Sequence, residues 1–302
     1  MRHQQPAHSR PRPLPTADRP VSPEGLDLAR DTFECQLPDG TLTYCDTGGD
    51  KPVLLLLHGA YLSHQAWLPQ IVELRQHFRV IAPDLRAHGT STRAGKPYSV
   101  AMFAHDIQHL LVTLSLGPVY LCGHSLGGMV ALALTLNAPA SVHTLVLAET
   151  SYGTSSNRLE AFMTRWTRPM FSMFSVRWQA GLFARSLAKR NPRLQRYINR
   201  EVLDYVQDSS TYLAIWDAVI AFDFASSLSK LQVPSLVIAG AQNKKTHAQA
   251  RTFVQALPDA ELIMIPEAGH LVNLDQPDAF NSALIAFFQT KVAPLERDGA
   301  IR

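Results

Sequence analysis

Residues 119–128 read VYLCGHSLGG, a short apolar run followed by a serine between glycines. The run Val119–Cys122 predicts a buried strand, and Met129–Leu136 predicts the helix that follows. Ser125 therefore stands on a sharp strand-to-helix turn, and the glycines two residues to either side let neighbouring backbone pass close to it. Such a turn exposes the hydroxyl at the carboxyl edge of a sheet, so we predict that Ser125 is a nucleophile.

The composition is that of an ordinary globular protein, with 46% hydrophobic and 18% charged residues among 302. This length allows one large α/β domain or two small domains. A net charge of +3 is too mild to indicate a nucleic-acid-binding protein. No apolar run approaches the roughly 20 residues of a membrane span. We therefore expect no nucleic-acid partner, no stable membrane insertion and a cytoplasmic location, while the oligomeric state stays open.

The three cysteines lack the spacing of a metal site, and no phosphate-binding loop or dinucleotide fingerprint is present. We therefore expect neither a metal nor a cofactor. Cys122 lies in the strand before the nucleophile and is expected to be a buried thiol. Cys35 and Cys45 lie on the two arms of a predicted hairpin that turns at Pro38-Asp39-Gly40. A disulfide between them is the less favoured alternative to free thiols.

Residues 1–30 are rich in Pro, Arg, His and Gln and show almost no apolar periodicity. Such a segment cannot bury enough surface to offset its chain entropy, so it predicts a disordered tail. We do not expect a secretory signal, because no apolar stretch follows the arginines. A basic arm that binds a partner is the alternative. The predicted folded domain covers residues 31–302.

From Asp31 onward, short β-rich runs are separated by turn signals, with helical patterns between most of them. Nearly all-apolar strands that alternate with helices indicate an α/β fold with a mostly parallel central sheet and helices on both faces. The predicted strands are Thr32–Gln36, Thr41–Asp46, Val53–Leu57, Arg79–Ala82, Val119–Cys122, Thr144–Ala148, Ser235–Ala239 and Leu262–Ile265. The predicted helices include Trp67–His77, Val100–Leu114 and Ala248–Leu257.

Residues 151–229 interrupt this alternation after the strand that follows the nucleophile helix. They read as several helices, and we expect them to form a cap over the active edge of the sheet. Their aromatic residues favour an apolar substrate. Their arginines are solvated, or recognise a substrate carboxylate, or serve with the aromatics at a membrane surface. These residues are Phe162, Trp166, Phe171, Phe174, Trp178 and Phe183 with Arg158, Arg165, Arg168, Arg177 and Arg185.

Three further motifs follow predicted strands: His58-Gly59-Ala60-Tyr61, the DLRAHGTS run at 84–91, and Gly269-His270 near the C-terminus. Together with the serine turn, they make the chain resemble the α/β-hydrolase fold superfamily, over about residues 33–289. A serine followed by a histidine late in the chain is the order of that family.

The resemblance implies that Ser125 attacks a carbonyl carbon and that His270 takes and later returns the proton. It assigns the oxyanion hole to the backbone N–H groups of Ala60 and Leu126. His58, Tyr61 and His124 are assigned to the substrate pocket, and for His58 support of the loop is the favoured role.

The triad acid is where the sequence departs from the family pattern. Relatives usually place it in a Gly-x-x-Asp turn after the strand equivalent to Ser235–Ala239, and here that turn reads Gly240-Ala241-Gln242-Asn243. Asn243 can accept a hydrogen bond from an imidazole, but it has no negative charge to stabilise an imidazolium.

Glu149 closes the preceding strand of the predicted sheet, Thr144–Ala148, at the same active edge. Some members of the superfamily, including a group of haloalkane dehalogenases, place their acid after this strand. We therefore predict that the acid has moved to Glu149. The alternatives are that Glu149 only caps a strand or faces solvent, and that Asp217 or Asp223 of the cap supplies the charge.

A serine nucleophile argues against the dehalogenase and epoxide-hydrolase branches, which use aspartate. The pattern resembles most the carboxylesterase and enol-lactonase branch, which implies a serine hydrolase that cleaves a small, apolar ester or lactone through an acyl-enzyme. One alternative is a non-hydrolytic or C–C bond-cleaving enzyme on the same site, such as an acyltransferase, perhydrolase or lyase. The other is a catalytically weak ligand-binding homologue that has lost its acid.

Overall fold

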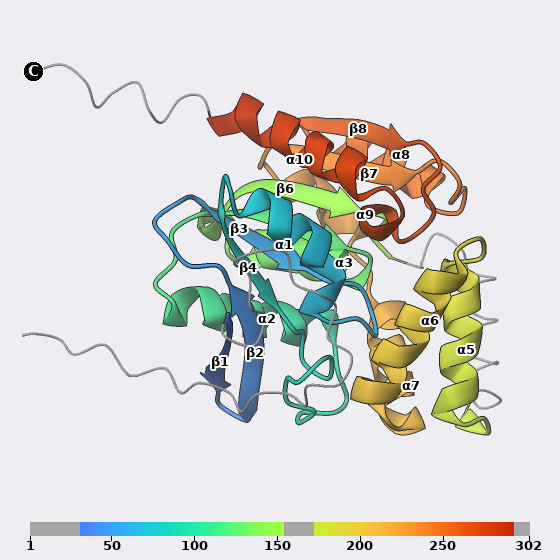
Figure 1. Ribbon diagram of the computed structural model, residues 1–302. Helices are drawn as coiled ribbons and strands as arrows, with labels where there is room; N and C mark the ends of the chain where they lie inside the picture. Colours follow the sequence, from blue (N-terminus) through green and yellow to red (C-terminus); the bar gives the residue numbers. More distant parts are fainter. Residues whose placement is uncertain (1–30, 154–171, 293–302) are drawn as a thin grey trace, which may run out of the picture.

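An eight-stranded sheet forms the centre of the protein, and Figure 1 shows helices packed around it. The computed structural model describes residues 31–153 and 172–292. The predicted disordered tail lies outside these residues, as does the 154–171 part of the predicted cap. The strands are β1 (Thr32–Leu37), β2 (Gly40–Asp46), β3 (Val53–Leu57), β4 (Arg79–Pro83), β5 (Val119–His124), β6 (Val142–Ala148), β7 (Ser235–Gly240) and β8 (Ala260–Ile265).

The strand order is β1-β2-β4-β3-β5-β6-β7-β8. From β4 to β8 all neighbouring strands are parallel, and only β2 runs antiparallel to both of its neighbours. Every residue of β5 and of β7 is buried, as expected for parallel strands that helices cover on both faces. The predicted mostly parallel α/β sheet is confirmed.

Alternate residues of β3 divide between two hydrophobic cores, one on each face of the sheet. Leu55 and Leu57 belong to one core, and Leu54 and Leu56 belong to the other. The first core is covered by α2 (Val100–Thr113), α3 (Leu126–Asn137) and α8 (His247–Ala256), and the second by α1 (Leu68–Leu74), α9 (Val272–Asp275) and α10 (Pro277–Val292). A continuous apolar strand is therefore needed to fill both cores.

The hairpin register keeps Cys35 and Cys45 apart. Cys35 lies opposite Leu42, and Cys45 lies opposite Thr32. Both thiols are free and buried, as is that of Cys122. The disulfide alternative is therefore wrong, because the two cysteines are not cross-strand partners.

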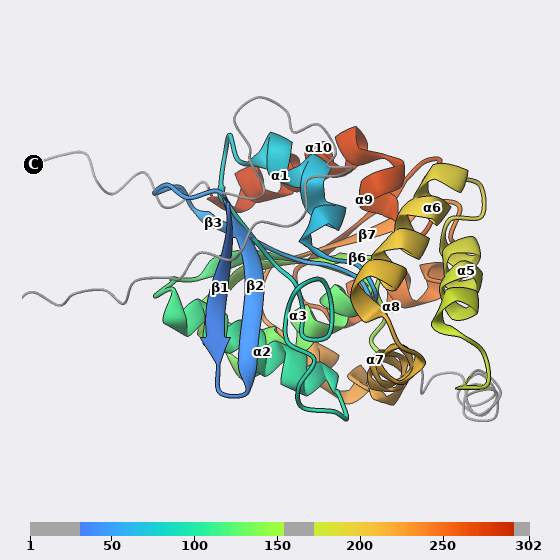
Figure 2. The ribbon, with the colours of Figure 1, turned by 60° about the horizontal axis from the view of Figure 1, so that its bottom comes forward.

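Between β6 and β7 the chain forms a group of helices, and residues 172–230 are called the helical insertion below. Its elements are α5 (Val176–Leu187), α6 (Pro192–Glu201), the π-helix η3 (Val202–Val206), α7 (Ser209–Ala221) and the 3-10 helix η4 (Ala225–Lys230). Figures 1 and 2 show α5, α6 and α7 beyond the end of the sheet toward which the β6 arrow points. Strand β5 ends at this same edge of the sheet, and the turn with Ser125 follows it. None of the described helices combines the length and the apolar character needed to cross a membrane.

Aromatic side chains join the helical insertion to the core. The ring of Tyr61, in the loop after β3, stacks on that of Tyr212 from α7 with 4.2 Å between centroids. Its hydroxyl donates a hydrogen bond to the Tyr212 carbonyl at 2.9 Å. Phe183 of α5 packs edge-on against Tyr61 at 4.8 Å. The insertion is thus anchored beside the loop in which the oxyanion hole is predicted.

A buried carboxyl group forms a second link between the insertion and the core. Glu201 of α6 is 4% exposed and accepts a hydrogen bond from Ser63 Oγ at 2.6 Å. Burial raises the pKa of Glu201 to about 7; the Ser63 bond opposes the rise, and the nearby Asp84 carboxylate adds to it.

Glu201→Gln is expected to stabilise the protein at pH 8 much more than at pH 5. Because the pKa is raised on folding, the native state keeps a proton that the unfolded chain releases, and stability falls as pH rises toward 7. The variant has no such loss, so its advantage in unfolding free energy should grow by about 2 kcal/mol over this range. Urea unfolding of both proteins at both pH values measures it; parallel pH dependences would contradict the assignment.

Candidate active site

Ser125 occupies a strained backbone conformation at the junction of β5 and α3, with φ 52° and ψ −117°. The flanking glycines are required because other chain segments pass too close for a side chain. A Cβ on Gly123 would lie 2.3 Å from the Gly127 carbonyl oxygen, and one on Gly127 would lie 2.0 Å from that of Leu57. The Gly-x-Ser-x-Gly spacing therefore follows from the packing of β5 against α3 and β3.

The structure brings His270 to Ser125 from 145 residues further along the chain. His270 lies in the loop between β8 and α9, and its Nε2 is 3.1 Å from Ser125 Oγ. This is the hydrogen-bonding distance expected for the predicted nucleophile and general base. The side chain of His270 is 18% exposed and Ser125 is also partly exposed, so the pair is not sealed from solvent.

Glu149 lies on the other side of the imidazole. Its Oε2 is 3.4 Å from His270 Nδ1, and the residue is 2% exposed. Glu149 has a φ of 48° at the end of β6, so the chain turns sharply at this residue. The three side chains therefore lie in the acid–histidine–serine order predicted with Glu149 as the acid.

Three donors from other parts of the chain hold the Glu149 carboxylate. The Gly240 N–H donates to Oε1 at 2.5 Å, and Asn243 Nδ2 and Thr246 Oγ1 donate to Oε2 at 2.5 Å and 3.0 Å. Hydrogen bonds to a charged acceptor are what make a buried carboxylate tolerable. Thr246 was not foreseen from the sequence, which carries no signal linking a threonine to a glutamate almost 100 residues away.

Asn243 occupies the usual acid position but serves the carboxylate instead. Its Nδ2 is also 3.3 Å from His270 Nδ1. If Nε2 accepts the serine proton as predicted, Nδ1 carries a hydrogen of its own, and an amide N–H beside it cannot be its acceptor. The acceptor within reach is Glu149, and Asn243 fixes where that acceptor lies. Asp223, an alternative acid, is exposed and caps the turn before η4 through the Ala225 N–H.

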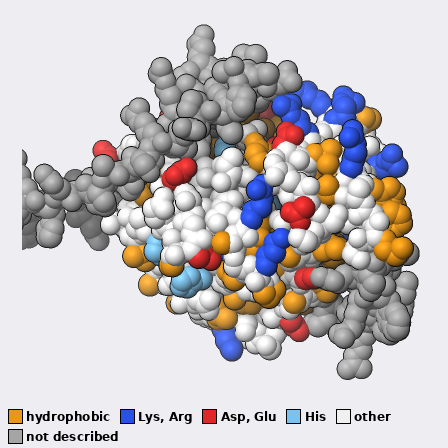
Figure 3. Space-filling view, turned by 90° about the horizontal axis from the view of Figure 1, so that it is seen from below, with side chains coloured by type: hydrophobic (Ala, Val, Ile, Leu, Met, Phe, Trp, Pro, Cys, Tyr) orange, Lys and Arg blue, Asp and Glu red, His pale blue; other side chains and the backbone are white. Residues whose placement is uncertain are grey.

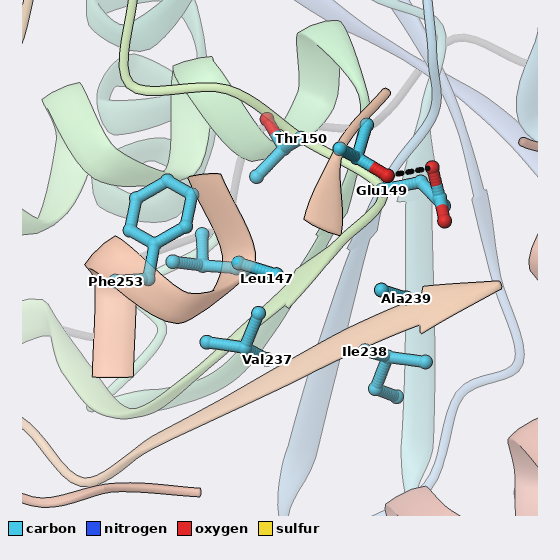
Figure 4. Close-up of a pocket in the computed structure, with 9 residues that line it drawn as sticks. Leu147, Glu149, Thr150, Val237, Ile238, Ala239 and Phe253 are labelled. Atoms are coloured by element: carbon cyan, nitrogen blue, oxygen red, sulfur yellow. Dashed lines mark hydrogen bonds between the residues drawn. The ribbon is translucent and has the colours of Figure 1, made fainter. Parts of the chain in front are cut away.

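Apolar side chains close the space behind Glu149. Figure 4 shows Glu149 lining a narrow space together with Leu147, Val237 and Phe253, between β6, β7 and α8. The dashed line in Figure 4 marks the hydrogen bond with Thr246. Because apolar groups exclude water from this side, the carboxylate depends on its protein donors and on His270.

The two predicted oxyanion donors lie in backbone next to the serine. Leu126 is the first residue of α3, where N–H groups have no partner within the helix. The loop that carries Ala60 passes close by, because a Cβ on Gly59 would lie 3.3 Å from Ser125 Cβ. Their role in holding an oxyanion stays a prediction.

His124 and His58 use their rings to connect loops around the site. His124 Nε2 lies 2.7 Å from the His270 carbonyl oxygen, and burial lowers the pKa of His124 to about 3, so the neutral ring donates this bond. His58 Nδ1 contacts the Gly59 carbonyl at 2.8 Å, and its Nε2 accepts from the Leu85 N–H at 3.0 Å. Both rings are buried, and their part in shaping the substrate pocket stays a prediction.

No group of three His, Cys, Asp or Glu side chains suited to a metal ion occurs within residues 31–153 and 172–292. Of the five arginines that the sequence predicts to be solvated or, alternatively, to recognise a substrate carboxylate, Arg177 and Arg185 are exposed on α5. Arg158, Arg165 and Arg168 lie outside the described residues.

Comparison with known proteins agrees with this architecture. The family model of the alpha/beta hydrolase fold matches residues 52–277. The chain belongs to this family.

Several proteins of known structure or name are similar to this α/β hydrolase. It is 28% identical over 243 residues to the putative carbamate hydrolase RutD of Escherichia coli K12, covering 78% of this chain and 91% of that protein. A hydrolase from Pseudomonas aeruginosa superimposes with a TM-score of 0.77 at 26% identity, covering 85% of this chain and 98% of that chain. The enol-lactonase from Burkholderia xenovorans gives 0.71 at 25% identity, covering 83% and 97%.

A thermophilic esterase from Thermogutta terrifontis is also similar to this α/β hydrolase, with a TM-score of 0.73 at 26% identity, covering 83% of this chain and 94% of that chain. The expected family and the hydrolase fold are thus confirmed. The names of these proteins differ in the substrate class that they give, and so they do not identify the substrate of this α/β hydrolase.

Proposed function

We propose that this α/β hydrolase is a serine hydrolase that cleaves a carboxylic ester or lactone through an acyl-enzyme intermediate. The observation that carries the proposal is the contiguous chain from Ser125 Oγ to His270 Nε2 at 3.1 Å and from His270 Nδ1 to Glu149 Oε2 at 3.4 Å. This is the arrangement of nucleophile, base and orienting acid that acyl transfer requires.

The first half of the reaction forms the acyl-enzyme. His270 removes the hydroxyl proton as Ser125 Oγ attacks the carbonyl carbon, and Glu149 stabilises the imidazolium. The carbonyl oxygen becomes an oxyanion beside the N–H groups of Ala60 and Leu126, each worth roughly 3 kcal/mol in the transition state. His270 then gives the proton to the leaving alcohol, or to the ring-opened hydroxyl of a lactone.

The second half reverses these roles with water. His270 deprotonates a water molecule that attacks the acyl carbon, and the proton returns to Ser125 as the acid is released. An alcohol that replaces water gives acyl transfer, which is the non-hydrolytic alternative on the same residues.

We further propose that the helical insertion acts as the cap of this site and favours an apolar substrate. Tyr61, Phe183 and Tyr212 form an aromatic cluster between the insertion and the oxyanion loop. Aromatic and apolar walls are typical of pockets that bind hydrophobic groups. A carbamate is the second candidate substrate class, because a relative is named a putative carbamate hydrolase and a carbamate presents the same acyl carbon to the serine.

The test is the initial rate of hydrolysis on a chain-length series of p-nitrophenyl esters, with a γ-lactone and a phenyl carbamate as further substrates. We expect turnover of esters or lactones, with a maximum at the acyl length that fills the pocket. Turnover of the carbamate alone would favour the second class. Ligand binding without turnover of any carbonyl substrate would contradict the proposal.

A further inference from the structure

Helix α5 turns two of its large apolar side chains, Trp178 and Leu182, toward solvent, although Phe183 of the same helix packs on the core. Ala180, Ala184 and Ala188 are buried beneath it, whereas Trp178 is 44% exposed and Leu182 is 41% exposed. In the usual amphipathic pattern the large apolar side chains pack on the core, so an exposed Trp and Leu on one helix need an explanation.

The exposed apolar residues of α5 and of the turn before it form one strip. Met173 is 84% exposed and Phe174 is 37% exposed, and the Phe174 ring stacks on Trp178 with 4.1 Å between centroids. Trp178 and Leu182 are four residues apart and therefore share one face of the helix. Four of the six large apolar side chains that are exposed in the described part of the chain lie in this apolar strip.

The segment that carries the apolar strip also carries many exposed cations. Residues 172–201 contain seven Lys and Arg side chains, all exposed, and a single acidic residue, Glu201, which is buried. Among the described residues, Arg200 is the only one of the seven with an ion pair, to Asp204 at 3.3 Å. Since the whole chain carries only +3, positive charge is concentrated here. Figure 3 shows Lys and Arg side chains gathered along one edge, with hydrophobic side chains beside them.

We propose that this face of α5 and α6 docks onto the surface of an anionic lipid bilayer. Trp, Phe and Leu side chains enter the headgroup boundary while the cations contact lipid phosphates, which is how interfacial helices bind. A nucleic acid would use the cations and leave the apolar strip exposed. A second copy in a two-fold contact would set like charges against each other.

The position of the docking face suggests what the contact does. The insertion that carries it also packs on Tyr61, in the loop beside Ser125. Docking therefore holds the edge of the active site against the bilayer, where apolar esters collect. This consequence rests on the proposed function, whereas the docking itself does not.

The experiment is co-sedimentation of the full chain with vesicles of phosphatidylcholine alone and of phosphatidylcholine with an equal part of phosphatidylglycerol. We expect binding to the anionic vesicles only, weakened by salt. The triple variant Arg185→Gln, Lys189→Gln, Arg193→Gln should bind roughly 100-fold more weakly. Trp178→Ala should bind at least roughly tenfold more weakly, because an interfacial aromatic ring is lost.

The controls change one exposed apolar residue and one exposed basic residue elsewhere on the protein. Val112 on α2 is 72% exposed, and Arg251 on α8 is exposed. The variants Val112→Ser and Arg251→Gln should both bind the vesicles like the wild type. Ser125→Ala should also bind fully, which separates docking from catalysis. Absence of vesicle binding at low salt would overturn the proposal. The proposal would also be overturned if the triple variant and Trp178→Ala bound the vesicles as tightly as the wild type. Self-association or DNA binding by the protein in place of vesicle binding would overturn it as well.

Discussion

Ser125→Ala is expected to lower kcat on the best ester by on the order of 10⁶-fold, the loss seen when a triad nucleophile is removed. Ser125 Oγ lies 3.1 Å from His270 Nε2. Alanine has no hydroxyl, so His270 would have no proton to remove and no nucleophile to activate. The substitution also removes covalent chemistry, so a fluorophosphonate probe should add its mass to the wild type and not to the variant.

Ser186→Ala provides the matched control for this experiment. Ser186 is an exposed serine of α5 whose hydroxyl bonds only the Phe183 carbonyl in the described part of the chain. Its loss should leave both turnover and labelling unchanged. If Ser125→Ala kept its turnover within tenfold of the wild type, the nucleophile would have to lie elsewhere.

Glu149→Gln should lower kcat by about 10⁴-fold and leave KM nearly unchanged, as expected when a triad acid loses its charge. The glutamine keeps the shape of the side chain and can still meet the Gly240 N–H. It cannot stabilise the imidazolium of His270, whose Nδ1 lies 3.4 Å from the carboxylate. Steady-state kinetics measure the split between kcat and KM, and circular dichroism checks the fold.

Asn243→Asp distinguishes the two possible acid positions. In the wild-type background a second carboxylate would stand 2.5 Å from Glu149 Oε2, so repulsion should reduce activity. In the Glu149→Gln background the same change should restore part of the activity, because position 243 also reaches His270 Nδ1 at 3.3 Å. Near wild-type turnover of Glu149→Gln would instead show that the acid is another residue.

Much of the fold could be predicted because each central strand is a short, nearly continuous run of apolar residues in the sequence. The run Val53–Leu57 is apolar at every position, and β3 begins and ends at these residues. At the sheet edge the pattern is weaker: β8 begins at Ala260 rather than Leu262, because an edge strand with one exposed face tolerates Glu261. The helix predicted at Trp67–His77 is shorter, with a 3-10 turn before Pro69 and its end at Leu74.

The sequence by itself determined the serine turn. Its requirements, a buried strand, a serine at positive φ and glycines where backbone segments meet, are met within ten consecutive residues. Only the tertiary structure decided how the acid is arranged. Glu149 and Asn243 are 94 residues apart and follow two neighbouring strands, β6 and β7, so both reach the same imidazole. Which of them stabilises its charge depends on three donors that parallel strand pairing and α8 bring around one carboxylate, and no local pattern records that convergence.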